Sequence, residues 1–109
     1  MIDSGTIEKV TAMVLAVLDG NRRRARCQMP NLSYDYTCPS PSTYPFQWAW
    51  DSCFHAIALS HFDVPRAQEE ISSLLRAVYP DGFLPHIVMW QDELRANAVR
   101  DFPIALSDP

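Results

Sequence analysis

Residues 44–75 read YPFQWAWDSCFHAIALSHFDVPRAQEEISSLL, and this stretch decides the fold. Its middle part repeats apolar residues at the three- and four-residue spacing of an amphipathic helix. We therefore expect a helix that begins near Trp50 or Asp51 and runs to about Ser60. Asp51 falls in its first turn, where the helix dipole favours an anion.

A further helix is expected directly after this one. Asp63 is a favourable N-cap, and Pro65 fits a first turn because its missing N–H has no helical partner there. The pattern runs to about Val78 and leaves Glu69 and Glu70 on the solvent side. The apolar stripe consists of Ala67, Ile71, Leu74, Leu75 and Val78.

The N-terminal part of the chain predicts one more helix and then a long loop. Apolar residues at helical spacing predict an amphipathic helix from Thr6 to Asp19, with Gly20-Asn21 as its stop. Residues 21–45 contain four prolines among Asn, Ser and Thr. We expect this segment to be irregular, and loops of such length inside compact domains are often functional.

Arg22–Arg26 form a basic cluster within that segment. Such a cluster can be a phosphate-binding patch or a localisation signal. It can also be a solvated helix end whose cations face the negative pole of the helix dipole, and we expect this second role.

The C-terminal part predicts a turn and little regular structure. Residues 79–82, Tyr-Pro-Asp-Gly, favour a turn because Pro fixes φ and Gly accepts a positive φ. An extended or irregular apolar run is expected from Phe83 to Trp90, and a short helix at 92–99. The fold class is therefore all-α. Three amphipathic helices must bury their stripes, so the chain is either a small open bundle or a fragment of a larger domain.

Composition narrows the class of protein. The 109 residues are 48% hydrophobic, which fits one domain, and the net charge of -4 argues against a general binder of nucleic acid or anionic membranes. No apolar run approaches the ~20 residues of a membrane span, and the N-terminus does not resemble a secretory signal. Three cysteines without CxxC spacing predict neither a zinc site nor a closed disulfide framework. A cytoplasmic, reducing setting without a metal or cofactor is the simplest expectation.

Residues 44–51 place three aromatic rings besides Phe46, one amide and one carboxylate at the start of a helix. Sugars present flat apolar faces ringed by hydroxyls, so their sites need aromatic platforms with carboxylate and amide groups. Trp48 and Trp50 would point the same way on an extended segment but would diverge by about 200° on a helix. The residues alone leave a second interpretation open, in which the rings are core and Asp51 is a helix-start anion.

Seven short motifs resemble the N-terminal signature of the mannosylglycerate and glucosylglycerate hydrolases, which are similar to glycoside hydrolase family 63. The resemblance covers roughly residues 10 to 90, with departures at Leu59 and Tyr79-Pro80. The motifs are Tyr44-Pro45, Gln47-Trp48, Trp50-Asp51-Ser52, Phe54, Arg66-Ala67, Asp81-Gly82 and Pro85-His86.

The resemblance implies an (α/α)6 toroid of six helical hairpins with a central active site. Residues 1–109 would be an N-terminal fragment of that catalytic domain, without its acid and base, and inactive alone. Tyr44, Trp48, Trp50 and Asp51 would hold the sugar of a small carbohydrate substrate. Gln47 is a weaker candidate, and His86 is either a site residue or a structural histidine.

Three functions remain open at this point. The first is an inverting glycoside hydrolase acting on a small glycoside such as glucosyl- or mannosylglycerate. The second is a free-standing sugar-binding or protein-interaction module that uses the same aromatics as an exposed patch. The third is an α-glucosidase or trehalase-like relative.

Overall fold

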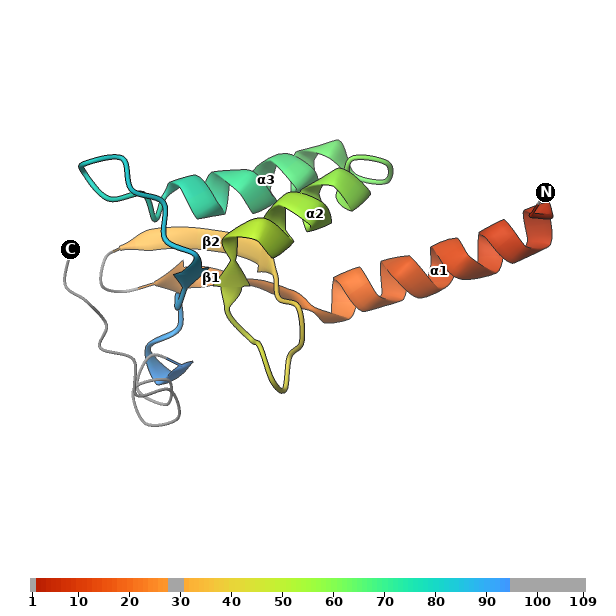
Figure 1. Cartoon of the computed structure of the whole chain (residues 1–109). Helices are drawn as coiled ribbons and strands as arrows, with labels where there is room; N and C mark the ends of the chain where they lie inside the picture. The colour runs from red at the N-terminus through yellow and green to blue at the C-terminus, as the bar shows by residue number, and fades with distance from the viewer. Residues whose placement is uncertain (1, 28–30, 95–109) are drawn as a thin grey trace.

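The computed structural model describes residues 2–27 and 31–94 and contains three helices and two small antiparallel sheets (Figure 1). The three expected helices are present within about three residues of their predicted bounds. The all-α prediction holds only in part, because the described part of the chain is about half helical and two small antiparallel sheets accompany the helices. The helix predicted at 92–99 lies largely outside the described residues. The elements are α1 (Ser4–Gly20), β1 (Arg22–Cys27), β2 (Leu32–Thr37), β3 (Gln47–Trp48), α2 (Ala49–Leu59), α3 (Val64–Leu75) and β4 (Ile87–Val88).

β1 and β2 form a hairpin within the segment expected to be irregular. Their register runs from Arg22 opposite Thr37 to Cys27 opposite Leu32. Residues 32–38 alternate between apolar and polar, so one face of β2 carries the aromatic and aliphatic side chains and the other the polar ones. The prolines of the segment fall outside both strands, where they remove no ladder hydrogen bond.

The basic cluster lies on β1, directly after α1, and the expected contact with the helix end is made by Arg23, which donates to the Gly20 carbonyl at 3.1 Å. Nε and Nη2 of Arg22 donate hydrogen bonds to the two carboxylate oxygens of Asp35 at 2.8 and 2.7 Å. Arg24 Nε lies 3.8 Å from the same carboxylate. The hydrogen bonds that Arg22 donates to Asp35 raise the pKa of Arg22, and the pair links β1 to β2.

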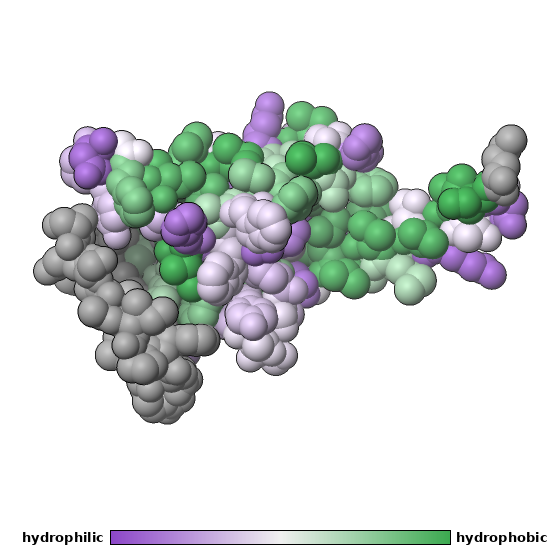
Figure 2. All heavy atoms as spheres, in the orientation of Figure 1, coloured by the Kyte–Doolittle hydropathy of each residue, from purple (hydrophilic) through white to green (hydrophobic). Residues whose placement is uncertain are grey.

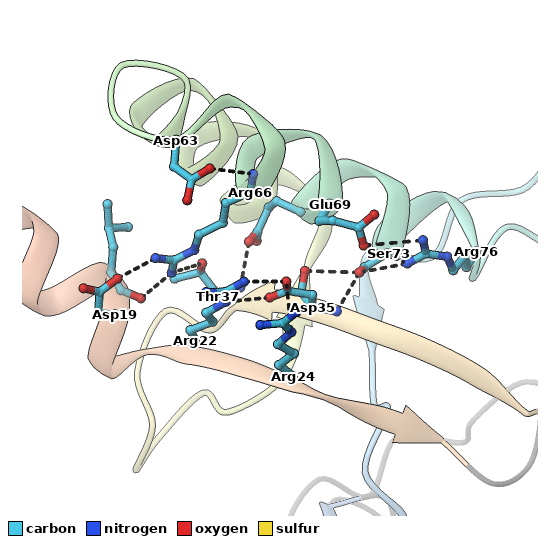
Figure 3. A network of polar contacts seen from close by, with 12 residues as sticks. Asp19, Arg22, Arg24, Asp35, Thr37, Asp63, Arg66, Glu69, Ser73 and Arg76 are labelled. Atoms are coloured by element: carbon cyan, nitrogen blue, oxygen red, sulfur yellow. Dashed lines mark hydrogen bonds and ion pairs between the residues drawn. The ribbon is translucent and has the colours of Figure 1, made fainter.

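α3 covers the free edge of β2 (Figure 3). The Glu70 carboxylate accepts a hydrogen bond from the Thr37 backbone N–H at 2.8 Å. The Ser73 hydroxyl accepts from the Asp35 N–H at 2.8 Å and donates to the Asp35 carbonyl at 3.1 Å. Side chains of a helix thus take the place of a third strand and satisfy backbone groups that would otherwise be costly to bury.

This edge contact corrects the predicted orientation of α3. Glu70 was expected on the solvent side, yet it is only 1% exposed, and Leu75 from the predicted buried stripe is 58% exposed. α3 is rotated about its axis relative to the predicted orientation, because its polar side chains form hydrogen bonds with the edge of β2. Its buried residues are Arg66, Ala67, Glu70, Ser73 and Leu74.

Two hydrophobic clusters form the core. One lies on the apolar face of the hairpin, where Trp90 stacks on Tyr34 with ring centroids 5.6 Å apart; its buried members are Cys27, Tyr34, Tyr36, Cys38 and Trp90. The other joins the three helices through Leu18, Leu59 and Ala67. Through Trp90, the first cluster packs the C-terminal segment against the hairpin. Through Leu18, the second packs the C-terminal end of α1 against α2 and α3.

The buried hydroxyl of Tyr36 should make the fold less stable at alkaline pH. It donates to the Pro45 carbonyl at 2.6 Å, and burial raises the pKa of Tyr36. A folded pKa above the unfolded value near 10 gives a contribution that is complete below about pH 10 and is lost as the pH rises further. Tyr36→Phe is therefore expected to lower the free energy of unfolding by about 1 kcal/mol at pH 7 and to weaken its decline above about pH 10.

Urea unfolding followed by circular dichroism at several pH values checks this expectation. Tyr44→Phe is the matched control, because its ring is exposed. An equal alkaline decline in the Tyr36→Phe protein and the parent would contradict it.

α1 projects from the body as an arm (Figure 1). Of its apolar residues, Leu18 is buried, whereas Ile7, Val10, Met13, Val14 and Val17 are exposed. α2 likewise exposes Trp50, Phe54 and Ile57. Figure 2 shows that apolar side chains extend from α2 and α3 onto the C-terminal end of α1. None of the described helices is long and apolar enough to cross a membrane.

Candidate functional site

The start of α2 is fixed by a short strand pair. In the β3–β4 pair, Trp48 lies opposite Ile87, and the Ala49 N–H donates to the His86 carbonyl at 2.8 Å. Trp48 is the extended N-cap of α2, with φ −104° and ψ 131°. The helix therefore begins between the two tryptophans, with Trp48 on extended backbone and Trp50 in the first turn.

The aromatic rings of this segment form two pairs instead of one stripe. Tyr44 and Trp48 meet edge to face with centroids 5.9 Å apart, and Trp50 and Phe54 do so at 5.2 Å. Phe46 is buried, but Trp50 is 71% exposed and Tyr44 is also exposed. The interpretation of these rings as core thus holds for Phe46 and does not describe Trp50.

Trp48 and Asp51 carry the polar groups of the candidate site. The Trp48 ring is half-buried, and its Nε1 is buried without a hydrogen-bond partner. A buried donor of this kind costs about 1–3 kcal/mol unless an acceptor reaches it. Asp51 is half-buried in the first turn of α2. Asp51 therefore offers a carboxylate acceptor next to the exposed Trp50, which suits a ligand with hydroxyl groups, whereas Trp48 Nε1 is enclosed by protein atoms.

Gln47 lies behind these residues and not among them. Its side chain is fully buried, and its Nε2 donates to the Ser52 hydroxyl and to the Glu70 carbonyl, each at 3.0 Å. Its Oε1 accepts from Trp90 Nε1 at 2.8 Å. With its amide fully engaged, Gln47 supports the backbone before Trp48.

His86 is brought next to the start of α2 by its backbone, and its side chain is exposed. A groove of about 390 Å³ lies beside it, lined by Pro85, Ile87 and Trp90 among others, but not by Trp48 or Asp51. Within residues 2–27 and 31–94, no group of three His, Cys, Asp or Glu side chains is arranged to hold a metal ion. The four candidate residues Tyr44, Trp48, Trp50 and Asp51 lie close together in the sequence around the start of α2, and "the wall" refers to these four residues below.

Three residues behind the wall were given no role in the site from the sequence, namely Ser52, Glu70 and Trp90. A sequence signal for this buried polar layer exists in α3, where Arg66, Glu70 and Ser73 recur at spacings of four and three. This is the helical period, carried by polar residues instead of apolar ones. A search for apolar stripes alone passes over it.

A family model described as the mannosylglycerate hydrolase MGH1-like glycoside hydrolase domain matches residues 44–107. The chain belongs to this glycoside hydrolase family. The match to the family begins at Tyr44, the first residue of the wall, so α1 and the β1–β2 hairpin precede the matched region.

Curated relatives within this family match about half of the chain. Mannosylglycerate hydrolase MGH1 of Selaginella moellendorffii is 43% identical over 53 residues, 49% of this chain and 11% of the relative. The mannosylglycerate hydrolase of Rubrobacter radiotolerans is 40% identical over 62 residues, 57% of this chain and 14% of the relative. The glucosylglycerate hydrolase of Mycolicibacterium hassiacum is 44% identical over 52 residues, 48% of this chain and 12% of the relative. No solved structure matches the chain.

Proposed function

We propose that this chain is the N-terminal part of an inverting glycoside hydrolase domain of the (α/α)6 type, and that its wall holds the sugar of a small glycoside such as mannosyl- or glucosylglycerate. The observation that carries the proposal is the two exposed rings, Tyr44 and Trp50, together with the Asp51 carboxylate at the start of α2. The rings would contact the apolar face of the sugar, and Asp51 would accept from its hydroxyls. The names of the relatives supply the substrate class.

Two observations support the proposal that this chain is part of a larger domain. They are its uncovered helix faces and the greater length of its relatives. α1 and α2 present apolar residues that a larger helical domain would bury. The chain spans only about an eighth of the curated relatives. An inverting glycosidase needs a carboxylic acid and a carboxylate about 6.5–9.5 Å apart. We assign both to later hairpins, because Asp51 is given the role of accepting hydrogen bonds from the sugar hydroxyls and not of transferring a proton.

A chimera tests this role of the wall. Residues 1–107 of this chain, of which 44–107 match the family model, would replace the corresponding segment of the Rubrobacter radiotolerans mannosylglycerate hydrolase together with what precedes it. The chimera should hydrolyse mannosylglycerate, and Asp51→Ala in it should lower kcat/KM by about 10- to 150-fold, because a hydrogen bond to a charged group contributes about 1.5–3 kcal/mol.

Glu69→Gln in the chimera is the control, since Glu69 pairs with Arg76 at 3.4 Å on α3 and is no part of the wall. The proposal fails if the chimera folds and turns over substrate but Asp51→Ala retains the full kcat/KM. Turnover by the purified 109-residue chain would contradict the assignment of the acid and base to later hairpins.

The exposed Trp50–Phe54 pair also favours a second candidate, a free-standing sugar-binding or interaction module. Calorimetry of the 109-residue chain with mannosylglycerate separates the two. Binding that is lost in Trp48→Ala and Asp51→Ala favours the module, whereas a chain that binds only within the chimera favours the fragment.

A further inference from the structure

A buried polar network lies directly behind the wall, and Glu70 on α3 is at its centre. One oxygen of the Glu70 carboxylate accepts from the Ser52 hydroxyl and the other from the Thr37 N–H, each at 2.8 Å. His55 Nδ1 lies 3.6 Å from the first oxygen. The network therefore joins β2, α2 and α3 through one carboxylate that is only 1% exposed.

Gln47 extends this network to the C-terminal segment. It donates to Ser52 and to the Glu70 carbonyl, and it accepts from the Trp90 indole. Gln47, Ser52 and Glu70 are all buried, and each makes at least two of these hydrogen bonds. Networks of this kind rigidify their surroundings where their members are satisfied. This holds for the side chains of Gln47, Ser52 and Glu70, whereas His55 Nδ1 is buried without a hydrogen-bond partner.

The position of the network in the sequence gives it a consequence for the wall. Gln47 directly precedes Trp48, and Ser52 directly follows Asp51. The two buried side chains thus fix the backbone at both ends of the four residues that carry the donor and the carboxylate. The Glu70 carboxylate holds Ser52 directly, and Ser52 in turn accepts from Gln47, whose other hydrogen bond goes to the Glu70 backbone carbonyl. A change of the Glu70 side chain therefore reaches Gln47 by way of Ser52.

We propose that Glu70 is the positioning residue of the wall, acting through Ser52 and Gln47; the proposal rests on the function proposed above. A carboxylate suits this place because it has acceptors alone and faces two donors, an N–H and an O–H. Hydrogen bonds to an ionised acceptor are also about twice as strong as neutral ones.

Glu70→Gln tests the proposal while it preserves the shape of the side chain. The new amide turns one acceptor oxygen into a donor, so the Thr37 N–H and the Ser52 O–H compete for one oxygen. In ¹H–¹⁵N spectra of the 109-residue chain, we expect the Trp48 indole and Asp51 amide signals to shift. Glu69→Gln, the same change on the neighbouring residue, which is half-exposed, should leave both in place. Unshifted Trp48 and Asp51 signals in a folded Glu70→Gln protein overturn the proposal.

Ser52→Ala is the alternative variant for this test if Glu70→Gln does not fold, because it removes the Ser52 hydroxyl donor and keeps the Glu70 carboxylate. The same two signals should shift, and unchanged signals again overturn the proposal.

The chimera supplies a readout that a purely structural role would leave unchanged. Glu70→Gln should lower kcat/KM about 10- to 100-fold at a temperature where the protein stays folded, because small misplacements at a site carry costs of this size. Leu59→Ala, a buried residue of the other cluster, should lower the Tm and retain kcat/KM. A Glu70→Gln chimera with full kcat/KM overturns the proposal.

Asp51→Ala in the same chimera separates the two hypotheses. If it lowers kcat/KM and Glu70→Gln does not, the positioning role is wrong and the wall stands. If neither lowers kcat/KM, the proposed function itself is wrong.

Discussion

Trp90→Ala is expected to lower the free energy of unfolding by about 3–5 kcal/mol, as is usual for a large aromatic side chain removed from a core. Trp90 is 4% exposed and stacks on Tyr34 in the cluster that joins the hairpin to the C-terminal segment. Its loss also leaves Gln47 Oε1 without the Nε1 donor that bonds it at 2.8 Å. Urea unfolding followed by far-ultraviolet circular dichroism measures the change.

Trp50→Ala is the matched control, because this tryptophan is 71% exposed on α2. Its effect on the free energy of unfolding should stay within about 0.5 kcal/mol, as for most surface substitutions. Equal losses in the two variants would show that the Tyr34–Trp90 cluster is not the core that the structure describes.

Arg66→Met should cost about 2–3 kcal/mol and loosen the base of α1. Arg66 is buried on α3 and donates to Asp19 at 2.6 Å and to the Leu18 carbonyl at 2.7 Å. Asp19 is 70% exposed, so the ion pair itself contributes little, and most of the loss comes from the buried carbonyl. Methionine keeps the aliphatic contacts, and the removal of Arg66 Nε, which has no hydrogen-bond partner, offsets part of the cost.

Hydrogen exchange at the Leu18 and Asn21 amides, together with urea unfolding, measures this effect. Arg24→Met on the exposed part of β1 is the control, since its side chain is 71% exposed. Unchanged exchange in Arg66→Met would contradict this role of Arg66 at the end of α1.

The helices could be predicted because their signals are local. Asp63 caps α3 by accepting from the Arg66 N–H, as expected of this residue type, and Pro65 lies in the first turn. The hairpin was missed for a different reason. Four prolines suggested an irregular segment, but the alternation of residues 32–38 between apolar and polar is the period of a strand and lies between two of those prolines.

The orientation of α3 depended on tertiary structure. Apolar periodicity placed Glu70 toward solvent, and the helix instead turns its polar stripe toward the open edge of β2, whose N–H groups need acceptors. That need arises only once the hairpin exists. An error in the hairpin therefore led directly to an error in the helix.

The composition of residues 44–51 predicted the candidate site residues, but the directions of their side chains depended on the first residue of α2. The N-cap there is Trp48, which makes no side-chain capping bond, so the usual Ser, Thr, Asp or Asn signal is missing. Pairing with residues 86–88 sets the start instead. A contact across about forty residues cannot be read from local pattern.

The two edges of the hairpin are closed to further strands in different ways. α3 occupies the edge of β2, and β1 carries four arginines, a charge density that opposes the stacking of identical strands. An isolated two-stranded hairpin with bare edges would be a template for cross-β growth. If this chain self-associates, it should do so through its uncovered helix faces, and its aggregates should keep their helical content and lack fibrillar order.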